Sequence, residues 1–142
     1  MPVRKSSAIW EGDLPHGKGK MKLGSGAYEG SYTFSSRFEE GKGSNPEELI
    51  GAAHAGCFSM AFANILAKAG HTPTKINTIA EVVLSKVGDG FQITQINLKC
   101  EAEVPDIQID EFMKHAEEAK VNCPVSQALK AVEINLEANL KS

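Results

Sequence analysis

The sequence predicts an α+β fold with mainly antiparallel sheets around one long buried helix. Three observations support it: strand-like alternation opens the chain, an apolar helical stretch occupies residues 46–69, and further strand and helix signals follow. The expected order is β-β-β-α-β-β-α-α-β, a mixture of strand runs and helices that is typical of α+β proteins. A chain of 142 residues fits one domain, and we expect residues 1–142 to form it.

Charge and composition exclude several classes of partner. The formal net charge is −3, with acidic and basic residues interspersed, so nothing favours binding to nucleic acid or to an anionic membrane surface. The opening segment "MPVRKSSAIWEGD" lacks the apolar core of a signal peptide. The apolar stretch 49–63 is short for a membrane span and contains His54. We therefore expect a cytoplasmic protein without membrane association, whose cysteines are free thiols.

The first strands are predicted within residues 4–12 and 18–34, where apolar and polar residues alternate loosely. Gly24-Ser25-Gly26 predicts a turn between two of them. The polar residues 35–45 predict a loop that leads to the long helix.

The long helix has clear start and stop signals. Asn45 can cap it, Pro46 suits its first turn, and Glu48 has the spacing of a capping box. Gly70 is a suitable stop. The helix is apolar nearly all round, so it must be covered on most sides, and one short chain offers limited material for that. Small residues would let another backbone approach, and we expect a second copy of the chain to help cover the helix. These residues are Ala52, Ala55, Gly56, Ser59 and Ala63.

Two strands are predicted after this helix. Residues 75–87 are apolar on both faces, which is typical of a central strand. Residues 91–104 follow a hairpin turn at Gly88-Asp89-Gly90. Their alternation changes phase between Ile93 and Ile96, which predicts a β-bulge.

The C-terminal part predicts two helices and a last strand. Residues 110–121 show apolar side chains at helical spacing, and Cys123-Pro124 opens a short helix. Residues 132–140 alternate strictly, which predicts a strand with one face in water.

The three cysteines differ in their predicted surroundings. Cys100 shares a strand face with apolar residues, so we interpret it as a packing residue. Cys57 lies in the apolar helix, about three turns from its start, where burial raises a thiol pKa and the helix dipole does not reach. Cys123 lies at a helix N-terminus, a setting that lowers a thiol pKa. These residues favour a reacting pair of Cys57 and Cys123, with simple packing as the open alternative.

A thiolate at Cys57 needs a cation. The chain has thirteen lysines and two arginines, and Arg37 stands just before the long helix. An arginine stays charged when desolvated, and Glu47 or Glu48 could hold it. Glu47 and Cys57 are ten residues apart, about 15 Å along one helix, so one guanidinium can hardly touch both. If a second subunit packs its helix antiparallel, its Arg37 and Glu47 can approach Cys57, and the site is shared across a dimer.

Two segments of the sequence resemble a known family. The segment "RFEEGKGSNPEELIGAAHAGCFSMAFANILAKAG", with the later "NCPVSQALKA", is similar to the OsmC/Ohr family of organic hydroperoxide reductases, and most similar to its osmotically inducible OsmC branch. The resemblance extends from Trp10 to the C-terminal "LKS". It implies an OsmC-like fold in an intertwined homodimer with active sites at the subunit interface. It also implies that Cys57 is the peroxidatic thiol and Cys123 the resolving thiol. Arg37 would hold the thiolate, and Glu47 would orient Arg37.

The resemblance implies a thiol-dependent peroxidase without metal or other cofactor. It would reduce organic hydroperoxides to alcohols through a Cys57 sulfenic acid and a Cys57–Cys123 disulfide, in defence against oxidative or osmotic stress. A lipoyl-type dithiol would then reduce the enzyme. The apolar residues Phe58, Met60 and Phe62 would favour an organic peroxide over hydrogen peroxide.

Three alternatives remain. His54, Cys57 and Cys123 could form a zinc site, although no close Cys-x-x-Cys pair supports it. A Cys–His pair could instead serve an acyl-transfer hydrolase. A non-enzymatic, stress-induced dimer would leave the cysteines as packing residues. Outside these alternatives we expect His54 to be a core or interface histidine with a hydrogen bond.

Overall fold

The computed structural model describes residues 1–141 and confirms an α+β fold. Its elements follow the order β-β-β-α-α-β-β-α-α-β, which adds one short helix to the predicted order. The backbone packs into two compact units, Met1–Leu49 and Ile50–Ser142.

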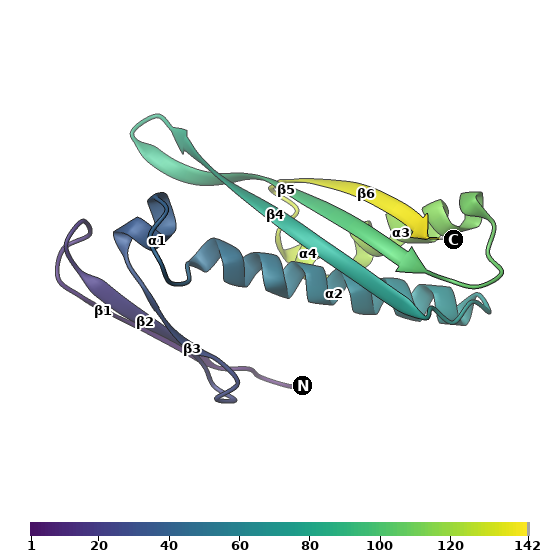
Figure 1. Ribbon diagram of the computed structural model, residues 1–142, viewed down its shortest axis with the longest axis horizontal. Coiled ribbons are helices and arrows are strands. Elements are labelled where there is room, and N and C mark those ends of the chain that lie inside the picture. The colour runs from purple at the N-terminus through teal and green to yellow at the C-terminus, as the bar shows by residue number, and fades with distance from the viewer. Residues whose placement is uncertain (142) are drawn as a thin grey trace. The chain divides into compact units, whose positions relative to one another are not determined.

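The first unit opens with an antiparallel sheet in the order β1-β2-β3 (Figure 1). Its strands are β1 (Ser6–Glu11), β2 (Lys18–Leu23) and β3 (Glu29–Tyr32). Gly19 pairs with Trp10 on one side and with Tyr32 on the other, and the two rings lie 5.3 Å apart across it. A Cβ at Gly19 would lie 2.6 Å from the Tyr32 ring, so only glycine fits there. The turn predicted at residues 24–26 is confirmed, with Gly26 at φ +82°.

The stretch predicted as a loop, residues 35–45, contains part of a short helix, α1 (Phe34–Phe38). Thr33 and Ser36 form a reciprocal capping box, in which Thr33 Oγ1 accepts the Ser36 N–H at 3.1 Å and Ser36 Oγ accepts the Thr33 N–H at 2.8 Å. Ser36 also donates its hydroxyl to the Ser44 carbonyl at 2.8 Å. These bonds fix the start of α1, and Arg37 follows directly after Ser36.

The long helix α2 (Pro46–Lys68) begins in the first unit and continues into the second. Its predicted start is confirmed, because Asn45 Oδ1 accepts the Glu48 N–H at 2.8 Å while Glu48 itself is exposed. Its predicted stop is confirmed by Gly70 at φ +90°. By length and composition alone α2 would pass as a membrane span, a test that the core helix of a soluble protein also passes. Only 28% of the apolar 18-residue stretch of α2 that meets this test is buried within the chain.

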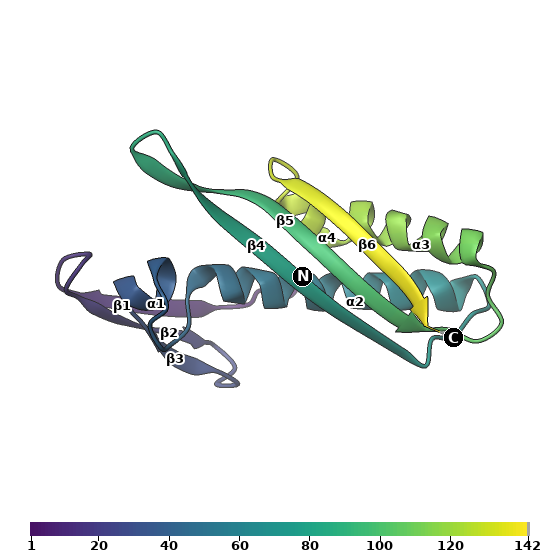
Figure 2. The same cartoon turned by 45° about the horizontal axis from the view of Figure 1, so that its top comes forward.

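The second unit contains a three-stranded sheet in the order β4-β5-β6, covered on one face by helices (Figures 1 and 2). The remaining elements are β4 (Lys75–Val87), β5 (Gly90–Glu103), α3 (Ile109–Asn122), α4 (Pro124–Ala128) and β6 (Glu133–Lys141). β4 and β5 form the predicted antiparallel hairpin, whereas β6 pairs with β5 in parallel.

One prediction about this sheet is confirmed and one is wrong. Val83 pairs with Gln95 and Leu84 with Ile93, so Thr94 is the extra residue of the predicted bulge. β4 is an edge strand rather than the predicted central strand, because β6 pairs with the other side of β5. One face of β4 is also exposed along much of its length, because the helices cover only the other face of the sheet, and Ile79 on the open face is 59% exposed.

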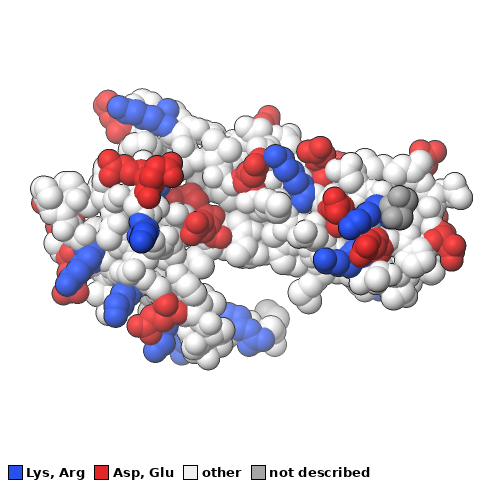
Figure 3. All heavy atoms as spheres, in the orientation of Figure 1, with Lys and Arg blue, Asp and Glu red and all other residues white. Residues whose placement is uncertain are grey.

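The core of the second unit lies between the sheet and its helices. The Phe62 ring of α2 packs at a tilt against two other rings. Its centroid lies 5.6 Å from that of Phe58 and 5.3 Å from that of Phe112 of α3. β5 contributes the apolar side chains of its buried face: Ile96, Leu98, Cys100 and Ala102. On the face of the molecule in Figure 3, basic and acidic side chains are interspersed, as the sequence indicates.

Candidate active site

The two thiols predicted to react lie against each other in the second unit. Cys57 is half-buried on α2, and Cys123 is fully buried between α3 and α4. Their side chains are within hydrogen-bonding reach of each other, and both are free thiols. The backbone N–H of Val125, in the first turn of α4, points at the Cys57 sulfur. The fold therefore brings together two sulfurs that are 66 positions apart in the sequence (123 minus 57).

Cys123 occupies a backbone corner. It is both the C-cap of α3 and the N-cap of α4, in an extended conformation with φ −63° and ψ 138°. Pro124 takes the first helical position, as predicted, because it has no N–H to leave unpaired there. The Cys123 sulfur accepts the Ser126 N–H at 3.3 Å and lies 3.1 Å from the Ser126 hydroxyl oxygen.

His54 completes this buried cluster. It stands three residues before Cys57 on α2, and its Nε2 lies 2.8 Å from the Ser126 hydroxyl oxygen. The prediction of a core histidine with a hydrogen bond is confirmed. Burial lowers the pKa of His54, so the ring is neutral at neutral pH. Its Nδ1 has no hydrogen-bond partner among residues 1–141.

Sequence reasoning assigned no role to Ser126. The local signal was present, since Ser126 stands three residues after Cys123, where its N–H can reach a cap residue. Its second partner, His54, is 72 residues away in the sequence. A contact at that separation leaves no pattern in the sequence.

The surroundings of Cys57 within the second unit disfavour a thiolate. Burial raises the pKa of the Cys57 thiol, the nearby Cys123 side chain raises it further, and the Val125 N–H partly opposes the rise. A cation from elsewhere is needed to ionise this sulfur at neutral pH.

Arg37 and Glu47 form an ion pair within the first unit. Arg37 Nε donates to Glu47 Oε1 at 3.0 Å, and the terminal guanidinium nitrogen donates to Oε2 at 2.9 Å. The guanidinium carbon also lies 5.3 Å from the centre of the Phe38 ring. The Glu47 side chain is 10% exposed and that of Arg37 36%, so the carboxylate is enclosed while the guanidinium keeps an open side. Residue chemistry alone left Glu47 and Glu48 both possible, the family resemblance favoured Glu47, and Glu47 is the residue that pairs with Arg37 here.

The remaining predicted residues lie apart from this cluster. Cys100 is 2% exposed on the buried face of β5, as predicted, and burial raises its pKa to about 11. Phe58 and Phe62 are fully enclosed in the core, so in this chain they offer no surface to a substrate, whereas Met60 is 76% exposed.

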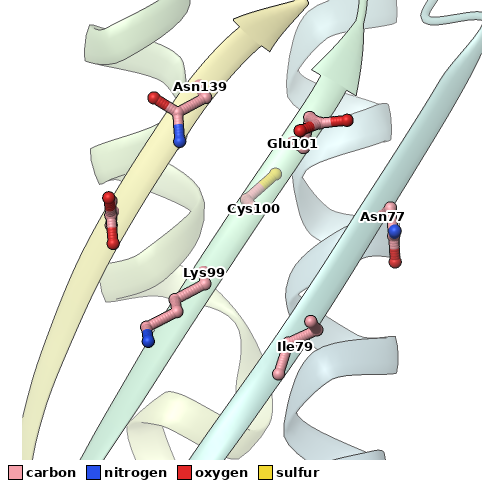
Figure 4. A pocket seen from close by; sticks show the side chains of 7 residues that line it. Asn77, Ile79, Lys99, Cys100, Glu101 and Asn139 are labelled. Atoms are coloured by element: carbon pink, nitrogen blue, oxygen red, sulfur yellow. The ribbon is translucent and has the colours of Figure 1, made fainter.

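A hollow of about 230 Å³ lies on the solvent-facing side of the β4–β6 sheet, and neither Cys57 nor Cys123 is among its lining residues (Figure 4). Side chains that line it include Asn77, Lys99 and Glu101, with Cys100 beside them on the neighbouring strand position. Within residues 1–141 there is no group of three His, Cys, Asp or Glu side chains that could hold a metal ion.

Comparison with known proteins identifies the family. Residues 39–137 match the OsmC-like protein family. Over 140 residues the chain is 54% identical to Peroxiredoxin OsmC of Escherichia coli (strain K12), which covers 98% of this chain and 97% of that protein. The chain belongs to the OsmC family. The resemblance seen in the sequence is therefore confirmed.

Solved structures confirm the OsmC-like fold. An OsmC-like protein of unknown function from Vibrio cholerae superposes with a TM-score of 0.78 at 16% identity, covering 97% of this chain and 99% of that one. An organic hydroperoxide resistance protein OsmC from Legionella pneumophila superposes with a TM-score of 0.73 at 20% identity, covering 99% of this chain and 100% of that one. The long helix, the sheets and the short C-terminal helix are thus features of the OsmC fold.

Proposed function

We propose that this OsmC-family chain is a thiol-dependent peroxidase that reduces organic hydroperoxides to alcohols in defence against oxidative or osmotic stress. The observation that carries the proposal is the contact between the Cys57 and Cys123 side chains at the start of α4. The 54% identity to a protein named Peroxiredoxin OsmC supports the same activity, as does the fold shared with an organic hydroperoxide resistance protein.

The reaction starts at Cys57, the more accessible of the two thiols. Its thiolate attacks the distal oxygen of ROOH, the O–O bond breaks, and the alkoxide leaves as alcohol after it takes up a proton. Sulfur is oxidised to a sulfenic acid, and the peroxide is reduced. The Cys123 sulfur then attacks the sulfenic sulfur, the S–S bond forms, and the hydroxyl leaves as water. A dithiol of the lipoyl type restores both thiols by exchange.

Arg37 supplies the cation that Cys57 lacks within its own surroundings. The bidentate bond to Glu47 fixes the plane of the guanidinium and leaves its open side for a sulfur or a peroxide oxygen. A positive charge there favours the thiolate and can stabilise charge that develops on the peroxide oxygens. Because the helical spacing separates Glu47 from Cys57, we assign this role to Arg37 and Glu47 of the partner subunit in a homodimer.

The exposed face of α2 supports the homodimer. Gly56 has open space where a Cβ would be, and Met60 is 76% exposed one turn further on. Exposed alanines extend this apolar face in both directions: Ala52, Ala53 and Ala67. Small residues of this kind let two helices approach closely, and a second copy of α2 would remove the face from water. The dimer would work in the cytoplasm, where dithiol reductants keep cysteines reduced.

Hydroperoxide consumption tests the activity. The purified protein with dihydrolipoamide should consume cumene hydroperoxide, and Cys57→Ser should abolish the reaction. Cys123→Ser should allow a single turnover that leaves a sulfenic acid on Cys57. Cys100→Ser is the matched control and should keep turning over. No consumption by the wild-type protein under these conditions would contradict the proposal.

A further inference from the structure

The second unit holds a polar chain that the proposed reaction does not yet use. His54, Ser126 and Cys123 are all buried, with exposed fractions of 0%, 3% and 0%. Two contacts connect them: Nε2 of His54 lies 2.8 Å from the Ser126 oxygen, and that oxygen lies 3.1 Å from the Cys123 sulfur. Buried polar groups of this kind must satisfy one another, because water cannot.

The Ser126 hydroxyl has one proton and two neighbours that could receive it. If Nδ1 carries the proton of the neutral His54 ring, the serine donates to Nε2, and the Cys123 S–H donates to the serine oxygen. If the thiol proton moves along this chain, the serine hydroxyl donates to a thiolate, and Nε2–H donates to the serine. The Ser126 N–H points at the sulfur in both arrangements, at 3.3 Å. The three side chains can therefore pass a proton without moving.

We propose that Ser126 and His54 accept the proton of Cys123 when its sulfur attacks the Cys57 sulfenic acid. This inference rests on the proposed peroxidase function and concerns only its second step. The S–H bond of Cys123 breaks, its proton moves to Ser126, and the serine proton moves to His54 Nε2. The S–S bond forms and the S–O bond of the sulfenic acid breaks. The departing hydroxide takes up the proton that His54 received and leaves as water, so His54 returns to its neutral form. Ser126 touches the reacting sulfur and is a catalytic residue, and His54 acts through it as a positioning residue.

His54 is a neutral ring at neutral pH. Burial lowers its pKa, so Nε2 is unprotonated and can accept a proton, and the same burial disfavours the protonated ring, which therefore gives the proton up again. Within residues 1–141, two further titratable groups face His54 along these hydrogen bonds. Cys123, between α3 and α4, contacts Ser126, and Cys57 on α2 contacts Cys123.

The test measures the two steps separately. Cumene hydroperoxide is added in one equivalent, and rapid quenching follows the loss of the Cys57 thiol and the appearance of the Cys57–Cys123 disulfide. In Ser126→Ala the first step should proceed while disulfide formation slows about 10²-fold, the usual scale of general acid–base catalysis. A sulfenic acid that reacts with dimedone should accumulate. Ser59→Ala is the matched control, because Ser59 lies on α2 and, within residues 1–141, its hydroxyl bonds that of Thr78, at 2.7 Å, and neither relay residue.

His54→Gln separates holding from proton transfer. A glutamine amide can still hydrogen-bond Ser126, but it does not take up a proton at neutral pH. In the wild-type protein, disulfide formation should fall in acid as His54 becomes protonated. In His54→Gln the rate of disulfide formation should be lower, and this acid limb should disappear.

The experiment distinguishes a wrong relay, a folding defect and a wrong proposed function. Equal rates of disulfide formation and equal pH profiles in wild-type protein, Ser126→Ala and His54→Gln would overturn the relay. Thermal unfolding of each variant identifies a folding defect, and the pH profile of His54→Gln decides the question if Ser126→Ala fails to fold. Failure of the proposed function looks different, because the wild-type protein itself would then form neither sulfenic acid nor disulfide.

Discussion

The reactivity of Cys57 depends on a balance of contacts at one sulfur. Burial and the neighbouring Cys123 raise its pKa, and the Val125 N–H lowers it. Because its pKa is raised, the Cys57 thiol ionises only at a higher pH than an ordinary thiol does. The sulfur is therefore mostly protonated at neutral pH. The guanidinium of Arg37 is the group that we propose shifts this balance.

Replacing Arg37 with alanine should therefore slow the first step. We expect the rate of Cys57 with cumene hydroperoxide at pH 7 to fall about 10²–10³-fold, the cost of removing one group that stabilises developing charge. The rate with iodoacetamide should also require a more alkaline pH than in the wild-type protein. Arg4→Ala is the matched control, because Arg4 is the only other arginine and lies exposed near the N-terminus. An unchanged midpoint in Arg37→Ala would contradict the role of Arg37.

Cys100 provides the contrasting thiol. Its pKa rises from the ordinary 9.0 to about 11, with burial as the largest cause. The folded protein thus binds this proton more tightly than the unfolded chain does, so this contribution to stability is present below about pH 9 and is lost as pH rises towards 11. In Cys100→Ala the free energy of unfolding should fall less steeply over this window than in the wild-type protein. Denaturant titrations at several pH values measure the difference, and identical slopes would contradict it.

At the scale of elements, the start of α2 is the junction that holds Glu47 in place. Asn45 accepts the Glu48 N–H through its side-chain oxygen and donates its side-chain amide to the Ser36 carbonyl of α1 at 3.0 Å. One residue therefore caps the helix that carries Glu47 and anchors the helix that carries Arg37.

Asn45→Ala should lower the free energy of unfolding by about 1 kcal/mol, the usual cost of a lost N-cap. Denaturant titration of the variant measures this loss. Asn64→Ala is the matched control, because Asn64 is exposed in the interior of the same helix, where alanine is the better helix former. A loss in the control as large as in Asn45→Ala would show that the cap is not responsible.

Local patterns predicted most elements, and contacts distant in the sequence explain the failures. The caps of α2, the bulge at Thr94 and the Cys123-Pro124 corner all follow from neighbouring residues. α1 was missed because it is only five residues long and its stability comes from a capping box and from Ser44. Apolar residues on both faces of β4 suggested a central strand, but strand order depends on where β6 returns, which alternation does not encode.

The residues of the candidate site also separate into those that the sequence predicts and one that it does not. Cys57, Cys123, Arg37 and Glu47 were predicted from residue chemistry and from the family resemblance. Ser126 was not, because its significance depends on His54, 72 residues earlier in the chain.

At the scale of the whole molecule, the proposed active site needs two copies of the chain. Cys57→Ser protein keeps Arg37, and Arg37→Ala protein keeps Cys57, so each is inactive or slow alone. A heterodimer of the two should contain one complete site, and a mixture that has exchanged subunits should consume cumene hydroperoxide faster than either parent. Mixing Cys57→Ser with Arg4→Ala protein gives the reference for subunit exchange. A mixture no faster than the Arg37→Ala parent, despite proven exchange, would contradict the shared site.

The proposed reaction depends most on the pairing of Cys57 with Cys123. The protein should be treated with one equivalent of cumene hydroperoxide, quenched with a thiol-blocking reagent, digested without reduction and mapped by mass spectrometry. We predict one new linked peptide pair that joins Cys57 to Cys123 within a chain, with Cys100 still a blocked thiol. A disulfide through Cys100, or Cys57 oxidised while Cys123 stays free, would contradict the account.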